Sequence, residues 1–138
     1  MYEKRGGRIF VVLLGKKTAK GKVRYHLPKG TLRFNETLEH GAKREVLEES
    51  GCRVKIEALL GGMTNKYIGY DGLMTEKTVI FFAMKKLADT KEHDNEYDFV
   101  KYLPIDVAIR KLKKTEPKKR EYIIVKRLKQ FLEAKNSK

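Results

Sequence analysis

The 138-residue sequence contains a single cysteine, three prolines and no tryptophan. One cysteine excludes an internal disulfide, so a reducing, cytoplasmic setting is expected. Long apolar runs are also missing. The longest clean run near the N-terminus, Ile9 to Leu14, is too short for a secretory signal or a membrane span. The sequence therefore predicts no contact with a membrane.

Acidic residues are few relative to basic ones, with 18 Asp and Glu against 32 Lys and Arg, and the net charge is +14. A positive field of this size attracts polyanions and is screened by salt. Nucleotides with several phosphates, RNA and inositol phosphates are compatible partners. The length and the 41% hydrophobic content predict one globular domain over residues 1–138. Whether that domain is a monomer or a homodimer stays open.

Apolar and alternating segments predict several strands and three helices. Strands are expected at residues 8–14, 23–27, 53–60, 77–84 and 99–103, and a weaker one at 63–70 after a break at Gly61-Gly62. Residues 1–7 are expected to be a polar lead-in, 15–22 a basic loop, 69–76 a turn-rich loop and 85–97 a charged loop. Helices are expected between residues 37 and 51, from Pro104 to about Lys114, and from Pro117 onward. This order favours an α/β fold with a mixed sheet covered on both faces.

The first helix has clear start and stop signals. Thr37 or Asn35 can cap its start, and Gly51 is suited to the position after its end. Its apolar residues recur every four positions, at Leu38, Ala42 and Val46.

Three carboxylates, Glu45, Glu48 and Glu49, fan across one arc of this helix and adjoin its apolar stripe. Like charges repel there, and crowding them against the core costs hydration. A bound cation explains the arrangement, because Mg²⁺ and Mn²⁺ take hard carboxylate oxygens. Arg44 precedes Glu48 by four residues and can hold its side chain. The alternative is a surface helix with ordinary ion pairs.

The spacing around this helix resembles the Nudix box, G-x5-E-x7-R-E-U-x-E-E-x-G-U. Every fixed position is filled, by Gly30, Glu36 and the run Arg44-Glu45-Val46-Leu47-Glu48-Glu49-Ser50-Gly51-Cys52. The resemblance implies a Nudix-type α/β/α sandwich in which the box forms a loop–helix–loop. It also implies an enzyme that hydrolyses phosphoric anhydrides with Mg²⁺, for which Mn²⁺ can substitute. One departure is Phe34-Asn35-Glu36, where many relatives have Pro-Gly-Glu.

The same resemblance assigns roles within the box. Glu45, Glu48 and Glu49 would be catalytic metal ligands, and the backbone carbonyl of Lys29 would complete the metal shell. Arg44 and Glu36 would be orienting residues, and Gly30 and Gly51 would be structural. Glu36→Gln should therefore reduce activity less than Glu48→Gln.

The resemblance leaves the general base open. In the family it is either a box glutamate or an acid on a later loop, commonly in an E-x5-W arrangement. Here Glu96 lies six residues before Tyr102, with Tyr in place of Trp, and Glu92 is the second candidate. The alternative is that both acids only solubilise the loop. His26 lies beside a strand–turn junction and is expected to be structural.

Substrate features resemble those of asymmetrical diadenosine tetraphosphate hydrolases, which form ATP and AMP. These features are Leu27-Pro28-Lys29-Gly30, the K-T-V strand at Lys77, and tyrosines 15 and 18 residues past Cys52. Tyr67 or Tyr70 would stack on adenine, and Lys77 and Lys29 would lie at the substrate. The alternatives are packing for the tyrosines and strand-edge solvation for Lys77.

A basic C-terminal region supports a second interpretation. Its members are Arg110, Lys111, Lys113, Lys114, Lys118, Lys119, Arg120, Lys126, Arg127 and Lys129. Such a cluster can hold an RNA backbone, as in an RNA 5′ pyrophosphohydrolase, or simply form a solvated face. A further alternative is a nucleoside triphosphate pyrophosphatase whose substrates include oxidised nucleotides. A binding module without catalysis is disfavoured, because relatives of that kind usually lose box acids.

Overall fold

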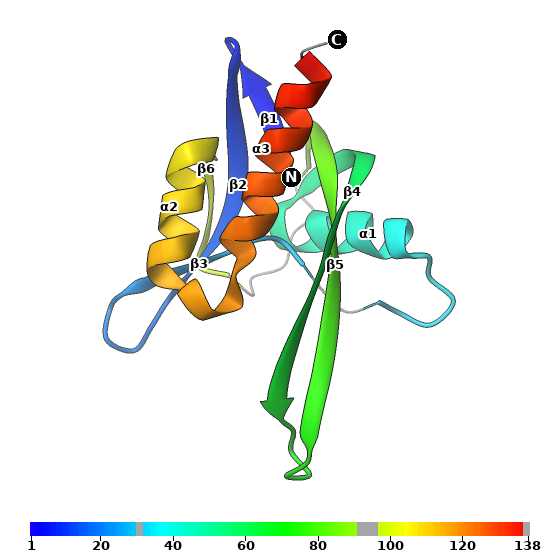
Figure 1. Ribbon diagram of the computed structural model, residues 1–138, viewed down its shortest axis with the longest axis vertical. Coiled ribbons are helices and arrows are strands. Elements are labelled where there is room, and N and C mark those ends of the chain that lie inside the picture. Colours follow the sequence, from blue (N-terminus) through cyan, green and yellow to red (C-terminus); the bar gives the residue numbers. More distant parts are fainter. Residues whose placement is uncertain (30–31, 91–96, 137–138) are drawn as a thin grey trace.

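The computed structural model describes residues 1–29, 32–90 and 97–136 and shows an α/β fold with one mixed sheet (Figure 1). The strands are β1 (Tyr2–Arg5), β2 (Arg8–Lys17), β3 (Val23–His26), β4 (Cys52–Ile68), β5 (Met74–Asp89) and β6 (Phe99–Pro104). The helices are α1 (Leu38–Ser50), α2 (Ile105–Thr115) and α3 (Glu121–Asn136), with a 3₁₀ turn at Pro117–Lys119. The predicted fold class is confirmed.

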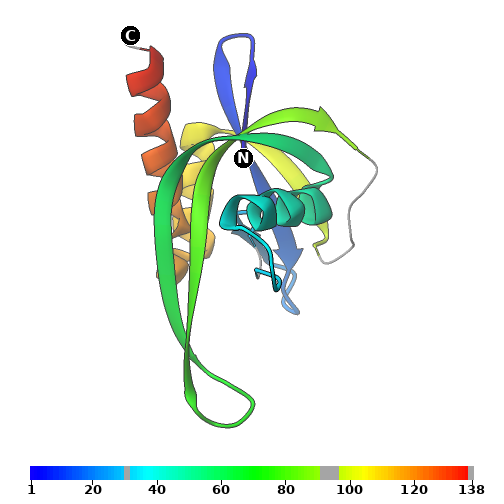
Figure 2. The same cartoon turned by 90° about the vertical axis from the view of Figure 1, so that its right-hand side faces the viewer.

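The strand order is β3-β2-β1-β5-β4, and β6 pairs with β2. Most neighbours are antiparallel, whereas β1 and β5 are parallel and meet at Tyr2 and Lys85. Helix α1 lies on one side of the sheet, and α2 and α3 lie on the other (Figure 2). Within the described residues, no helix is long and apolar enough to cross a membrane.

Two apolar clusters hold these layers together, because successive side chains of a strand point to opposite faces. On the α1 side, Phe82 and Met84 of β5 pack in one cluster with Val46. On the other side, Val79 and Phe81 of β5 belong to the cluster that includes the buried apolar residues of α2 and α3. Strand β5 therefore separates the α1 layer from the α2–α3 layer.

Two local predictions were wrong. The expected lead-in at residues 1–7 contains β1, and its Tyr2 is 1% exposed. Its polar sequence hid a strand that forms by pairing with β2. The expected break at Gly61-Gly62 lies inside the continuous β4, where the register shifts between Leu59 and Gly61. A β-bulge absorbs the glycine, whose φ of 138° few other residues adopt.

The predicted loops flanking β5 and following β2 are shorter than expected. Strand β5 includes residues expected in the loops at 69–76 and 85–97, and β2 extends into the expected basic loop as far as Lys17. The outer part of the β4–β5 hairpin projects away from the helices (Figures 1 and 2). Large apolar residues are exposed there, at Tyr67, Ile68, Tyr70, Leu73 and Met74. We call residues 64–78 the outer hairpin.

Candidate active site

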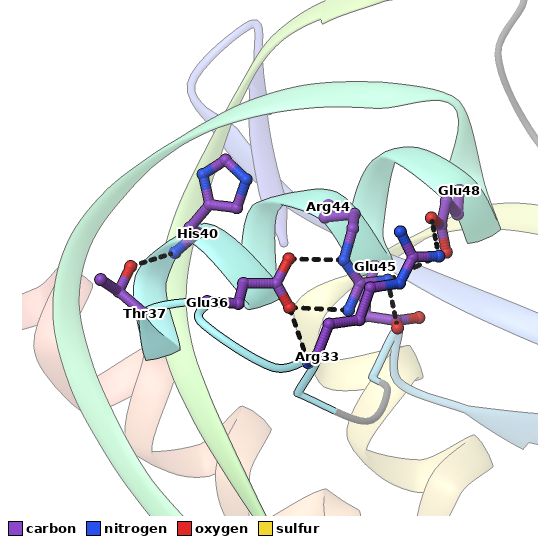
Figure 3. Close-up of polar contacts among 7 residues, drawn as sticks. All are labelled: Arg33, Glu36, Thr37, His40, Arg44, Glu45 and Glu48. Carbon is purple, nitrogen blue, oxygen red and sulfur yellow. Dashed lines mark hydrogen bonds and ion pairs between the residues drawn. The ribbon is translucent and has the colours of Figure 1, made fainter.

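Local signals define both ends of α1. The Thr37 hydroxyl accepts a hydrogen bond from the His40 N–H at 3.1 Å (Figure 3), which confirms Thr37 as the cap. Asn35 instead adopts φ 62° in the preceding loop. Gly51 is left-handed with φ 76°, and its N–H donates to the Leu47 carbonyl at 2.9 Å. The helix that presents the box carboxylates is thus fixed at both ends.

The carboxylates lie where helix α1 meets the core. Glu49 is 5% exposed and Val46 is 1% exposed. The side chains of Glu45 and Glu48 are 17% and 35% exposed. The predicted overlap between the acidic arc and the buried stripe is present at Val46 and Glu49, whereas Leu38, the first residue of the predicted stripe, is 49% exposed. The charge on Glu49 needs partners.

Arg44 joins the box acids to one another (Figure 3). Its Nε and Nη2 form a fork on Glu36 at 2.6 and 2.9 Å. Its Nη1 donates to Glu45 at 2.7 Å and to Glu48 at 3.2 Å. Arg33 adds a second guanidinium contact to Glu48 at 3.1 Å. The orienting contacts expected of Glu36 and Arg44 are present.

The electrostatics of Glu36 follow from these contacts. The Arg44 guanidinium, followed by the Arg33 backbone N–H at 2.9 Å, lowers the pKa of Glu36 to about 2. The same hydrogen bonds to Glu36 raise the pKa of Arg44. Both groups stay charged at neutral pH, and this ion pair holds the loop before α1 against the helix.

Gly41 allows that loop to approach α1 closely. A Cβ added at Gly41 would lie 2.8 Å from Leu32 Cδ1 and 3.0 Å from Glu36 Oε1. Sequence analysis missed this residue, which occupies a variable position of the box. A glycine on a helix face opposite a loop is the signal that could have identified it.

Lys29 connects the strand β3 segment to the box. Its N–H donates to Glu49 Oε2 at 3.2 Å, and its ammonium pairs with the buried Glu121 of α3. The predicted substrate contact of Lys29 would therefore have to compete with Glu121, if it involves the ammonium. Its carbonyl remains a predicted metal ligand. Sequence analysis also missed Glu121, which is far from the box in sequence.

A small cavity of about 80 Å³ lies between α1 and β5. Its lining residues are Pro28, Lys29, Leu32, Leu38, Gly41, Ala42, Glu45, Thr78, Val79, Ile80, Phe81 and Met84. Thr78 and Ile80 belong to the predicted K-T-V strand, so this strand does lie beside the box. The Thr78 hydroxyl is 2.8 Å from that of Thr64.

Of the predicted substrate residues, Lys29 lines this cavity, whereas Lys77, Tyr67 and Tyr70 do not. Lys77 precedes the lining residues Thr78 and Val79 in β5, but it is exposed and does not itself line the cavity. Tyr67 and Tyr70, which are 49% and 114% exposed, line a separate open depression at the outer hairpin. Their substrate roles stay predictions that this arrangement does not support.

Three predicted residues, Gly30, Glu92 and Glu96, lie outside the described residues. Tyr102, the landmark used for Glu96, is described. Its hydroxyl lies 3.2 Å from Cys52 Sγ, and burial raises its pKa to about 12. The assignment of the general base therefore stays a prediction.

His26 has the buried environment expected of a structural residue. It is 8% exposed, and its Nδ1 has no hydrogen-bond partner among the described residues. Burial, followed by the charges of Lys119 and Lys29, lowers its pKa to about 4. His26 is therefore neutral at physiological pH.

The chemistry of the donor set fits a hard divalent cation. In the described part of the chain, however, no three acid, His or Cys side chains are grouped so as to hold a metal. Glu45 and Glu48 instead share Arg44 Nη1. A cation at this site would have to compete with the Arg44 and Arg33 guanidinium groups for these carboxylates.

Comparisons with known proteins identify the family and several relatives of this chain. The family model of the NUDIX domain matches residues 1–124. Over 94 residues, the chain is 35% identical to a Mycobacterium tuberculosis (strain CDC 1551 / Oshkosh) protein described as "Putative mutator protein MutT4". The match covers 67% of this chain but 38% of that protein, so the chain spans well under half of its length.

Solved structures show the same fold. A C. elegans Ap4A hydrolase binary complex matches with a TM-score of 0.71 and 21% identity, over 96% of this chain and 93% of that chain. The MutT protein from Methanosarcina mazei Go1 matches with a TM-score of 0.58 and 20% identity, over 94% of this chain and 90% of that chain. At these identities the similarity shows the fold alone.

Proposed function

This chain belongs to the NUDIX domain family, and we propose that it hydrolyses a diphosphate linkage of a nucleoside polyphosphate with a divalent cation. One observation carries the proposal. Glu45 and Glu48 meet on one guanidinium, Arg44, which the half-buried Glu36 holds in turn. This arrangement gathers negative charge on a rigid helix and fixes its orientation.

Glu45, Glu48 and Glu49, together with the Lys29 carbonyl, would hold Mg²⁺ or Mn²⁺. When bound, the cation neutralises charge on the phosphate oxygens and makes water a better nucleophile. Arg44 keeps the Glu45 and Glu48 side chains on one side of α1, and Glu36 keeps Arg44 in place. Glu96, or a box glutamate, would accept the proton of the attacking water.

Diadenosine tetraphosphate, cleaved to ATP and AMP, is the first candidate substrate. The residues Thr78-Val79-Ile80 of the K-T-V strand line the same cavity as Glu45, which supports a role for this strand at the substrate. The likeness to Ap4A hydrolases in sequence pattern supports the same choice. Stacking by Tyr67 or Tyr70 and phosphate contact by Lys77 stay predictions.

Two alternative substrates have specific support. The 35% identity to a protein described as a putative mutator protein favours a nucleoside triphosphate pyrophosphatase whose substrates include oxidised nucleotides. The exposure of basic residues on α2 and α3, among them Arg110, Lys111 and Lys126, favours RNA 5′ ends. For each of these activities, we propose that the chain acts as a single catalytic domain, either as a monomer or as a homodimer.

A substrate panel tests the proposal. Diadenosine tetraphosphate, 8-oxo-dGTP, ADP-ribose and 5′-triphosphorylated RNA are incubated with Mg²⁺ and with the metal chelated. We expect diadenosine tetraphosphate to be hydrolysed fastest, and every hydrolysis to stop on chelation. A preference for ADP-ribose contradicts the substrate proposal. Hydrolysis that persists in Glu48→Gln contradicts the assignment of the metal site.

A further inference from the structure

The first residue of α3, Glu121, is a buried carboxylate outside the box. It is 2% exposed. Its Oε1 accepts the Leu27 N–H at 2.8 Å, and its Oε2 pairs with the Lys29 ammonium. A buried carboxylate is stable only with such partners, and the positive end of the α3 dipole adds to them. Glu121 therefore holds the segment that enters the box.

Side chains from the C-terminal helices cover one edge of β3. Among the described strands, β3 pairs only with β2. The backbone N–H groups of Tyr25 and Leu27, in alternate positions, donate to Thr115 Oγ1 at 3.2 Å and to Glu121 Oε1. Alternate amides of a strand point to the same edge. Thr115 and Glu121 thus take the place of a partner strand along the approach to the box.

One further hydrogen bond carries this restraint to the box carboxylates. The N–H of Lys29 donates to Glu49 Oε2 at 3.2 Å. Glu121 and Glu49 therefore both bind Lys29, Glu121 through the ammonium and Glu49 through the backbone N–H. Glu49 is itself 5% exposed, so neither carboxylate can move to another partner without disturbing the core.

We propose that Glu121 is a positioning residue of the active site, which fixes the Lys29 peptide and Glu49 in the arrangement that binds a divalent cation. The inference rests on the proposed function, because it assumes that the Lys29 carbonyl and Glu49 are metal ligands. It extends the site to α3, far from the box in sequence. Partners that orient metal ligands commonly change metal affinity by about 10- to 100-fold when they are lost.

Glu57 of β4 offers a matched control. Its side chain is 11% exposed and pairs with Lys135 of α3 at 2.6 Å, and it also accepts a hydrogen bond from Tyr2. Glu57 therefore ties α3 to the sheet as Glu121 does, but its polar contacts among the described residues are with Tyr2 and Lys135, outside the box. Glu57→Gln should lower stability without changing metal affinity.

The test is the affinity for Mn²⁺, measured by electron paramagnetic resonance of the free ion, together with the melting temperature in chelator. We expect Glu121→Gln to bind Mn²⁺ about 10- to 100-fold more weakly than the wild type. Glu57→Gln should bind it as the wild type does, despite a lower melting temperature. Equal Mn²⁺ affinity in Glu121→Gln and the wild type overturns the inference.

Lys29→Met provides a second variant if Glu121→Gln does not fold, because it keeps the backbone carbonyl and removes the ammonium. It should also weaken Mn²⁺ binding, and unchanged affinity in it overturns the inference. If both variants fold, the double variant should bind no more weakly than the weaker single one. Failure of the proposed function looks different: either the wild type binds no Mn²⁺, or Glu48→Gln binds it as tightly as the wild type.

Discussion

The box helix and the outer hairpin are built in opposite ways. At α1, guanidinium groups hold Glu36, Glu45 and Glu48, and a backbone amide holds Glu49. At the outer hairpin, large apolar side chains such as Tyr70 and Leu73 face solvent. A network of charged contacts fixes atoms for chemistry, whereas an exposed two-stranded ribbon is only marginally stable by itself. We therefore propose that α1 carries the catalysis. Of the outer hairpin, only Thr78 lines the cavity beside Glu45.

Glu48→Gln should have the largest effect on activity. Losing one ligand removes several kcal/mol of transition-state charge stabilisation, so kcat should fall by about 100-fold or more. The matched control is Glu39→Gln, which removes an exposed acid from the first turn of α1. Steady-state hydrolysis of diadenosine tetraphosphate measures both. An equal fall in kcat in the two variants would show that the effect comes from the overall charge of the helix and not from a metal ligand.

Arg44→Lys should lower both activity and stability. The Arg44 side chain is 14% exposed and contacts three carboxylates, and lysine cannot reproduce the fork on Glu36. We expect a loss of about 2 kcal/mol in the free energy of unfolding and at least about tenfold in kcat. Urea denaturation and kinetics check this. A stable, fully active Arg44→Lys would contradict the claim that the Arg44 contacts support stability and activity.

Gly41→Ala should separate activity from stability. The new methyl group would displace Leu32 and Glu36, which costs about 1 kcal/mol or more, while alanine favours the helix by about 1 kcal/mol. The melting temperature should therefore change little, and activity should fall because the loop moves. Leu32→Ala in the same chain should restore activity by making room. Failure of that rescue would contradict the close-approach argument.

Acid should weaken the box network through Glu36. Its folded-state pKa is near 2 and its usual value is 4.5, so the ion pair stabilises the fold fully above about pH 4.5. That contribution is lost as the pH falls from 4.5 towards 2. Urea denaturation between pH 2 and 6 should show a steeper loss in the wild type than in Glu36→Gln. Parallel curves would show that Glu36 has no linked proton.

Tyr70→Ser should have the smallest effect. A base stacked on Tyr70 would contribute about 1–3 kcal/mol, whereas the exposed ring lies apart from the cavity beside Glu45. We expect kcat/KM for diadenosine tetraphosphate to change by less than about threefold. A tenfold rise in KM with unchanged kcat would bring the outer hairpin to the substrate and overturn the separation of the two regions.

The sequence predicts most accurately what depends on neighbours in the chain. Helix geometry is local, so it predicts the cap at Thr37, the helix end at Gly51 and the position of Glu45 in the acidic arc. Lys77 does not line the cavity although its neighbours Thr78 and Val79 do. That difference depends on how β5 packs against α1, which the sequence pattern does not specify.

Distant contacts were the main source of error. Strand β1 is polar and forms only because β2 lies beside it, and β4 absorbs Gly61 as a bulge while it pairs with β5. Glu121 meets Lys29 across 92 positions of the chain. No spacing rule links such residues, so their roles became visible only in the structure.

The most direct test of the central claim is the binding of Mn²⁺ to the wild type, Glu45→Gln, Glu48→Gln and Tyr70→Ser under one set of conditions. The account predicts that both box variants bind the ion at least about tenfold more weakly, because each lacks a carboxylate ligand. It predicts wild-type affinity in Tyr70→Ser. Wild-type affinity in both box variants would contradict the claim that α1 holds the cation.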